Sequence, residues 1–171
     1  MIELERTFLA KYIPKGLENC KKKEIIDIYI PKSERHPILR IRKSGDIMEI
    51  TKKCPVEGND STKQLEQTIP LSKEEYEELA KTPGKISRRI RHYYEHKGKL
   101  AEIDVFLDDL KGLVWVDFEF ETEEEKDNFK MPDFCLADVS QEEFIAGGMI
   151  CGNKYENIES NLKKWGYKKL S

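Results

Sequence analysis

Short segments in which apolar and polar side chains alternate follow one another through the first 121 residues of the chain. Successive side chains of a β-strand point to opposite faces, so this pattern predicts strands that each have one apolar face. In segment 113–121, valine and phenylalanine at the even positions alternate with tryptophan, aspartate and glutamate. Turn-forming residues such as Ser44-Gly45-Asp46 separate the segments. The expected strands are residues 1–9, 24–30, 38–43, 47–53, 62–69, 86–94, 100–107 and 113–121.

Helix starts are expected where serine or threonine is followed three residues later by glutamate, since this spacing forms a capping box. A further helix is expected over residues 153–165, with Gly166 as its C-terminal stop. Together these elements predict a β-dominated α+β protein, in one domain over residues 1–171 with a helical portion at about 140–171. The pairs Ser72 and Glu75, Thr122 and Glu125, and Ser140 and Glu143 predict helices that end near Pro83, Phe129 and Gly147.

The overall charge is close to balanced, with 33 acidic against 30 basic residues and a net charge of −3. Neither nucleic acid nor a membrane is therefore expected as a partner, and any polyanion site must be local. The absence of a long apolar run and of a signal-peptide pattern predicts a cytoplasmic protein, either monomeric or homodimeric. The four cysteines and three histidines have no metal-ligand spacing, so we expect reduced thiols and, for any metal, oxygen ligands.

Charge on the polar faces of the predicted strands is sorted by sign from strand to strand. A solvated sheet face usually mixes signs within a strand, because cross-strand pairs need only local compensation. Here three strands carry acids and two carry only arginines, while Lys53 and Glu66 add one charge of each sign. The acids are Glu3, Glu5, Glu102, Asp104, Asp117, Glu119 and Glu121, and the arginines are Arg40, Arg42, Arg89 and Arg91.

Seven or eight antiparallel strands with short turns suggest a closed or nearly closed barrel whose apolar faces pack outward against helices. Burying so many charges costs several kcal/mol per ion, so such an interior must be wet or filled by ions. Arginine grips phosphate oxygens bidentately, and clustered carboxylates hold Mg²⁺ or Mn²⁺. The combination indicates a site for polyphosphate and metal. A ladder of internal salt bridges without any ligand is the alternative, and spacing alone leaves both open.

Several segments, in order, resemble the CYTH superfamily, the triphosphate tunnel metalloenzymes. The opening Ile2-Glu-Leu-Glu-Arg-Thr-Phe8 resembles the family's E-x-E-x-K signature, and the resemblance spans roughly residues 2–140. It implies an eight-stranded antiparallel barrel that forms a tunnel, with Mg²⁺ or Mn²⁺ as cofactor and a triphosphate-containing small molecule as substrate. The further matching segments are 39–46, 50–53, 89–91, 102–106, 112–119 and 138–140.

The resemblance also implies roles for individual residues. Glu3, Glu5, Asp117 and Glu119 match the family's two acidic pairs and are the expected metal ligands, with Glu66, Asp104 or Glu121 as further candidates. Glu5, Glu119 and Arg42 are expected to take part in catalysis. The residues that match the phosphate-binding bases are Arg40, Arg42, Lys53, Arg89 and Arg91.

One departure from the family pattern falls on the first strand, where Thr7 stands in the place of the signature lysine. The expected function is metal-dependent hydrolysis of inorganic tripolyphosphate or of an organic triphosphate. A non-catalytic polyphosphate or nucleotide binder, which Thr7 favours, and an adenylate cyclase-type member are the alternatives. A purely structural barrel is a third. The C-terminal apolar stripe is expected to pack on the core or to cover one tunnel mouth, and it consists of Tyr155, Ile158, Leu162 and Trp165.

Overall fold

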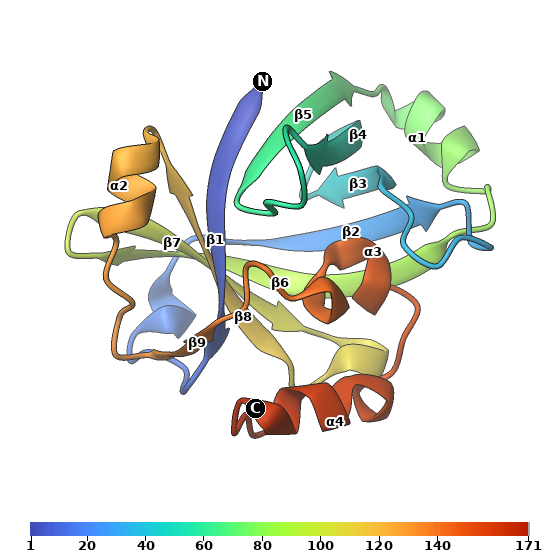
Figure 1. Cartoon of the computed structure of the whole chain (residues 1–171). Coiled ribbons are helices and arrows are strands. Elements are labelled where there is room, and N and C mark those ends of the chain that lie inside the picture. The colour runs from blue at the N-terminus through green and yellow to red at the C-terminus, as the bar shows by residue number, and fades with distance from the viewer. Residues whose placement is uncertain (171) are drawn as a thin grey trace.

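A computed structural model describes residues 1–170 and shows a closed β-barrel flanked by helices (Figure 1). Its strands are β1 (Ile2–Ala10), β2 (Lys22–Ile30), β3 (Leu39–Ser44), β4 (Ile47–Pro55), β5 (Lys63–Pro70), β6 (Lys85–His96), β7 (Lys99–Phe106), β8 (Val114–Phe120) and β9 (Cys135–Asp138). All pair antiparallel in the order β5-β4-β3-β2-β6-β7-β8-β1-β9. An additional pairing of β5 with β1 closes β1–β8 into a barrel.

The eight strands predicted from alternation are confirmed, and their ends agree with the prediction to within two residues. Alternation identifies them because each strand has one face toward the barrel interior and one toward the outer core. The ninth strand, β9, was not predicted. It has only four residues, and it exists because its backbone pairs with the end of β1, through a register shift between Leu9 and Ala10.

Two of the capped helices form close to where the sequence places them. In α1 (Lys73–Leu79), the Ser72 side chain accepts from the Glu75 N–H and the Glu75 carboxylate accepts from the Ser72 N–H. In α2 (Glu123–Asn128), the Thr122 side chain caps the Glu125 N–H. The final helix is α4 (Tyr155–Lys164).

The helix predicted between Ser140 and Gly147 is wrong. Ser140 does not cap a helix there, because its hydroxyl bonds to the side chain of Asp138 and accepts from the Thr7 N–H. The segment instead forms a 3₁₀ turn, η3 (Glu143–Ile145), and then the one-turn helix α3 (Gly147–Ile150). Shorter 3₁₀ turns occur at η1 (Leu17–Asn19) and η2 (Asp108–Leu110).

The apolar residues form two clusters, of which the first lies outside the barrel wall, as the outward apolar faces predict. One cluster, around Phe8 and Phe118, packs with Phe129 after α2 and with the segment that leads to β9. A second cluster packs Phe106 of β7 and Trp115 of β8, which share their strand faces with Asp104 and Asp117, against α4. In α4 the residues Tyr155, Ile158 and Leu162 are buried in this cluster, whereas Trp165 is partly exposed. The C-terminal stripe therefore packs on the core.

Membrane-crossing helices are not found within residues 1–170: no helix there has the length and apolar character that crossing requires.

Candidate functional site

The barrel encloses a cavity of about 870 Å³ to which all eight barrel strands contribute. Each strand contributes at least one charged side chain, because the inward position of each carries an acid or a base rather than an apolar residue. The side chains, one from each strand in chain order, include Glu3, Asp27, Arg40, Lys53, Glu66, Arg89, Glu102 and Asp117.

Carboxylates form one wall of the cavity, on the neighbouring strands β7, β8 and β1. Register places Glu5 directly opposite Glu119 and Glu102 directly opposite Asp117. Burial, together with the neighbouring carboxylates, raises the pKa of Glu3, of Glu119 and, most strongly, of Asp117. This wall therefore holds more negative charge than its protein surroundings neutralise, which is the electrostatic condition for binding a cation.

Arginines form the opposite wall, on β3 and β6. Arg42 donates two hydrogen bonds to Asp27, from Nε at 2.7 Å and from Nη2 at 2.9 Å, and Arg89 donates a third from Nη1 at 2.7 Å. Arg89 and Arg91 in turn donate to Asp104. Arg40 has its Nε buried without a hydrogen-bond partner among residues 1–170, 3.8 Å from Asp27. A buried N–H without a partner favours an oxygen-rich ligand there.

Two ion-pair seams join the acidic and basic walls. At one seam Lys53 contacts Glu3 and lies 2.8 Å from Glu5, with Glu66 at 4.0 Å. Burial alone would raise the pKa of Glu5, but the Lys53 ammonium lowers it to about 2. At the other seam Arg91 contacts Glu102 and lies 3.4 Å from Asp117. The Lys53 seam joins β4 to β1, so closure of the barrel creates it, whereas the Arg91 seam lies within the consecutive strands β6, β7 and β8.

Thr7, at the position of the signature lysine, points into the cavity and binds the acidic wall. Its hydroxyl donates to Asp117 Oδ1 at 2.7 Å. Arg6 points to the other face, as alternation predicts, and bonds to Asp138 and to the carbonyl groups of Lys126 and Phe129. Strand β1 therefore places no basic side chain in the cavity where the family signature has a lysine.

Residues 139–151 form a further boundary of the cavity that the sequence did not reveal. Val139 bonds through its N–H to the Thr7 carbonyl, and Gly152 bonds to the Ile86 carbonyl, so the segment spans from β1 to β6. In between it packs closely: a Cβ on Gly147 would lie 2.2 Å from the Tyr29 hydroxyl, and one on Gly148 would lie 2.1 Å from the Pro37 carbonyl. The glycine pair thus allows a close approach to β2 and its following loop.

Most of the residues predicted from sequence lie together around this cavity. Asp104 and Glu121 do not. Asp104 is fully buried behind the arginines and accepts from Arg89, Arg91 and the indole N–H of Trp115. Glu121 lies beyond the end of β8 and is exposed. The gathered residues are Glu3, Glu5, Arg40, Arg42, Lys53, Glu66, Arg89, Arg91, Asp117 and Glu119.

Asp27 is the central charged residue that sequence reasoning missed. It lies in an isoleucine-rich segment whose apolar content obscured the inward face. The signal was available, since Asp27 alternates with Ile26 and Ile28 and therefore faces the interior like Arg42, its register partner.

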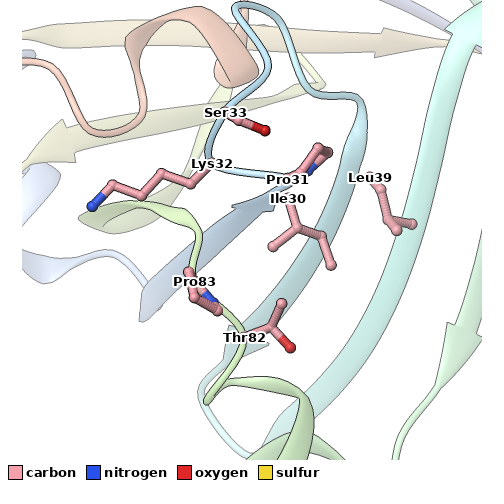
Figure 2. A pocket seen from close by; sticks show the side chains of 7 residues that line it. All are labelled: Ile30, Pro31, Lys32, Ser33, Leu39, Thr82 and Pro83. Atoms are coloured by element: carbon pink, nitrogen blue, oxygen red, sulfur yellow. The ribbon is translucent and has the colours of Figure 1, made fainter.

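Another hollow lies on the outer face of the barrel at the ends of β2 and β3. Figure 2 shows its lining, in which Lys32 extends away from the other side chains. It is an open, mostly apolar groove whose one charged lining residue is Lys32, so it is not a candidate catalytic site. Its lining is Ile30, Pro31, Lys32, Ser33, Leu39, Thr82 and Pro83.

Comparison with known families gives a match to the CYTH domain over residues 1–131. The chain belongs to the CYTH domain family. Its similar solved structures include the inorganic triphosphatase NE1496, at 22% identity and a TM-score of 0.63, covering 88% of this chain and 95% of that one. A candidate adenylate cyclase from Bacillus halodurans has 15% identity and a TM-score of 0.56, covering 99% and 92%. Comparison with curated proteins gave no match.

A third similar structure is the PH1012 protein from Pyrococcus horikoshii, at 12% identity and a TM-score of 0.51, covering 97% of this chain and 91% of that one. At these identities the structural likeness shows the fold. The prediction of an eight-stranded CYTH barrel from the sequence is therefore confirmed.

CYTH enzymes that act on triphosphates generally use a divalent metal ion. The acidic wall of this barrel suits such an ion. Its donors are carboxylate oxygens, which Mg²⁺ and Mn²⁺ prefer. Within residues 1–170 no three acidic, histidine or cysteine side chains already lie in a coordinating arrangement. Two of the candidate ligands are instead paired with a protein cation, because the Lys53 ammonium lies against both Glu3 and Glu5.

Proposed function

We propose that this chain hydrolyses a phosphoanhydride bond of a triphosphate held between the two walls of the barrel. The observation that carries the proposal is the opposition of an arginine wall and a carboxylate wall across one cavity, joined by Lys53 and Arg91. A linear triphosphate has anionic oxygens along its length, which arginines bind, and it is normally accompanied by divalent metal, which carboxylates bind.

The basic residues would bind and orient the phosphates. Arg40, Arg42 and Arg89 project from β3 and β6 to the same side of the cavity, so they can contact successive phosphoryl groups. Charge that develops on the phosphoryl oxygens during cleavage is stabilised best by donors already in place, and the arginines supply these. Arg42 is therefore proposed as a catalytic residue.

The acidic residues would hold Mg²⁺ or Mn²⁺. Glu3, Glu5, Asp117 and Glu119 are the proposed ligands, with Glu66 adjacent at the Lys53 seam. When bound, the metal would neutralise phosphate charge and lower the pKa of a coordinated water. In the reaction, water would lose a proton as its oxygen forms a new bond to phosphorus, the anhydride bond would break, and the remaining phosphate chain would leave with the bridging oxygen.

Inorganic tripolyphosphate is the favoured substrate within this class. The aromatic rings at the cavity are those of Tyr29, His36 and Trp115. Trp115 is occupied by an edge-on contact with Phe106 and by its bond to Asp104, and the Tyr29 hydroxyl is packed against Gly147. Neither Trp115 nor Tyr29 therefore offers a free face for stacking a nucleobase, and the third ring, His36, lies 3.7 Å from the Glu143 carboxylate. The similar fold of an inorganic triphosphatase supports the same choice.

The deciding experiment measures phosphate release from tripolyphosphate, ATP, GTP and thiamine triphosphate, each with Mg²⁺ or Mn²⁺. We expect release from tripolyphosphate that requires metal. Binding without release under every metal condition would instead support the non-catalytic alternative, which the Thr7–Asp117 pair favours. Formation of cyclic AMP from ATP would support the cyclase alternative. No thermal shift with any triphosphate would leave only a structural barrel.

A further inference from the structure

Five charged side chains form a continuous row of alternating sign that includes three arginines of the basic wall. In the order of their bonds they are Arg42 on β3, Asp27 on β2, Arg89 on β6, Asp104 on β7 and Arg91, again on β6. Each aspartate is bonded to two arginines, and Arg89 is shared by both aspartates. The row is therefore one connected network rather than a set of separate ion pairs.

The two aspartates are almost completely withdrawn from solvent. Asp27 is 2% exposed and Asp104 is 0% exposed. Asp104 accepts four hydrogen bonds, at 2.6 to 2.9 Å, from Arg89, Arg91 and Trp115. A carboxylate has about four lone-pair sites, so Asp104 has little capacity left for a metal ion. Its surroundings suit a buried support for arginines better than the metal-ligand role expected from sequence.

The bonds are made by a particular atom of each arginine. Arg42 donates from Nε to Asp27 at 2.7 Å, Arg89 donates from Nε to Asp104 at 2.6 Å, and Arg91 donates from Nε to Asp104 at 2.8 Å. An Nε–H bond fixes the plane and direction of the guanidinium group. Three long side chains that would otherwise sample many rotamers are thereby held in one arrangement before a ligand arrives.

We propose that Asp27 and Asp104 are positioning residues that fix Arg42, Arg89 and Arg91 as a rigid docking row for the triphosphate. The inference rests on the proposed function for its ligand, but its geometric part does not. Within the row three arginines accompany two aspartates, and Arg91 also contacts Glu102 of the acidic wall. Arg40 stands apart, because its Nε has no partner among the described residues. We expect a bound ligand to supply the hydrogen-bond acceptor for this Nε–H.

The first test uses the unmodified protein. Nitrogen-15 NMR of arginine side chains should show separate, slowly exchanging Nε–H signals for Arg42, Arg89 and Arg91 without any ligand. The signal of Arg40 should become protected only when tripolyphosphate is added. Arg35 serves as the solvent-exposed reference, because its side chain is 74% exposed and bonds to Glu143 through Nη2 rather than Nε. Rapid exchange of all three row signals in the free protein would overturn the proposal.

The second test compares affinities in Asp27→Asn and Asp104→Asn, with exposed Asp109→Asn as the matched control. Calorimetry should show tripolyphosphate binding at least tenfold weaker in both row variants and unchanged in the control. Charge alone predicts tighter tripolyphosphate binding by the row variants, because each of them removes a negative charge near an anion site. Equal or tighter binding by the folded row variants would overturn positioning.

Arg89→Lys keeps the charge but removes the planar fork, so it provides a second variant if either asparagine variant fails to fold. We expect weaker tripolyphosphate binding and little change for orthophosphate, which needs fewer aligned donors. Equal losses for both anions would overturn the proposal. If wild type itself fails to bind tripolyphosphate, the proposed function fails, while the NMR signals of the free protein still decide whether the row is rigid.

Discussion

The ammonium group of Lys53 lies 2.8 Å from the carboxylate of Glu5 and also contacts Glu3, so a lysine occupies the space between the paired acids of β1. A divalent ion bound by both acids must compete with this internal cation. We expect Lys53→Gln to bind Mn²⁺ about tenfold more tightly without substrate, because a like charge has been removed. Electron paramagnetic resonance titration of free Mn²⁺ measures this. The control is Lys52→Gln, whose side chain is exposed; weaker Mn²⁺ binding by Lys53→Gln would contradict the expectation.

Glu5→Gln and Glu119→Gln should each lower metal-dependent phosphate release by about 100-fold or more, since each removes a charged ligand opposite the other in register. Glu121→Gln, an exposed residue just past the end of the same strand, should retain wild-type activity. Steady-state release at saturating Mg²⁺ is the measurement. Undiminished activity in both variants of the acidic wall would remove the metal assignment.

Asp117→Asn should stabilise the fold while it weakens metal binding. Burial and the nearby Glu5 raise the pKa of Asp117 well above its usual value, so its charged form is unfavourable in the folded state at neutral pH. A neutral isostere removes that cost, and a gain of about 1 kcal/mol corresponds to about 2–4 °C in Tm for a protein of this size. Differential scanning calorimetry at pH 8 without metal tests this, and a lower Tm would contradict it.

Two sets of cavity carboxyl groups should make the stability of the fold change with pH in opposite directions. The pKa of Glu5 and that of Asp104 are lowered to about 2 by neighbouring cations, after allowing for burial. Their stabilisation is present above the unfolded values near 4 and is lost between about pH 4 and 2. The raised pKa values of Glu3, Asp117 and Glu119 make stability fall as pH rises above their unfolded values.

Added Mg²⁺ should therefore raise Tm more at pH 8 than at pH 5, since it offsets repulsion that exists only when these acids are charged. Thermal unfolding at both pH values, with Ca²⁺-free buffer and constant ionic strength, measures the difference. An equal shift at the two pH values would count against a cation site at the acidic wall.

Thr7→Val should weaken metal binding, because the lost hydroxyl bond leaves Asp117 with a still higher pKa and a less fixed carboxylate. The companion variant Thr7→Lys restores the charge of the family signature. If Thr7 has tuned this site away from rapid turnover, Thr7→Lys should raise phosphate release at least about tenfold. Release unchanged by Thr7→Lys would show that the native hydroxyl already serves the reaction.

Local sequence patterns were sufficient for the strands of the barrel and for most of the cavity residues. Alternation has a period of two residues, so it reports which face a side chain takes whatever the strand later pairs with. That is why Glu3, Glu5, Arg40 and Arg42 could be placed inside before any strand order was known. The capping boxes at Ser72 and Thr122 are equally local, and they too formed.

Tertiary structure decided what those inward residues contact. Ser140 failed as a helix cap because Asp138 and the Thr7 backbone compete for its hydroxyl, and β9 exists only through its pairing with β1. The closed barrel also brings Lys53 to Glu5, across 48 residues of sequence, and pairing of β6 with β7 places Asp104 against two arginines. By itself, the sequence determined a charged barrel interior. Strand pairing and closure of the sheet determined which charges neutralise one another, because ion pairs depend on distances that no periodic pattern contains.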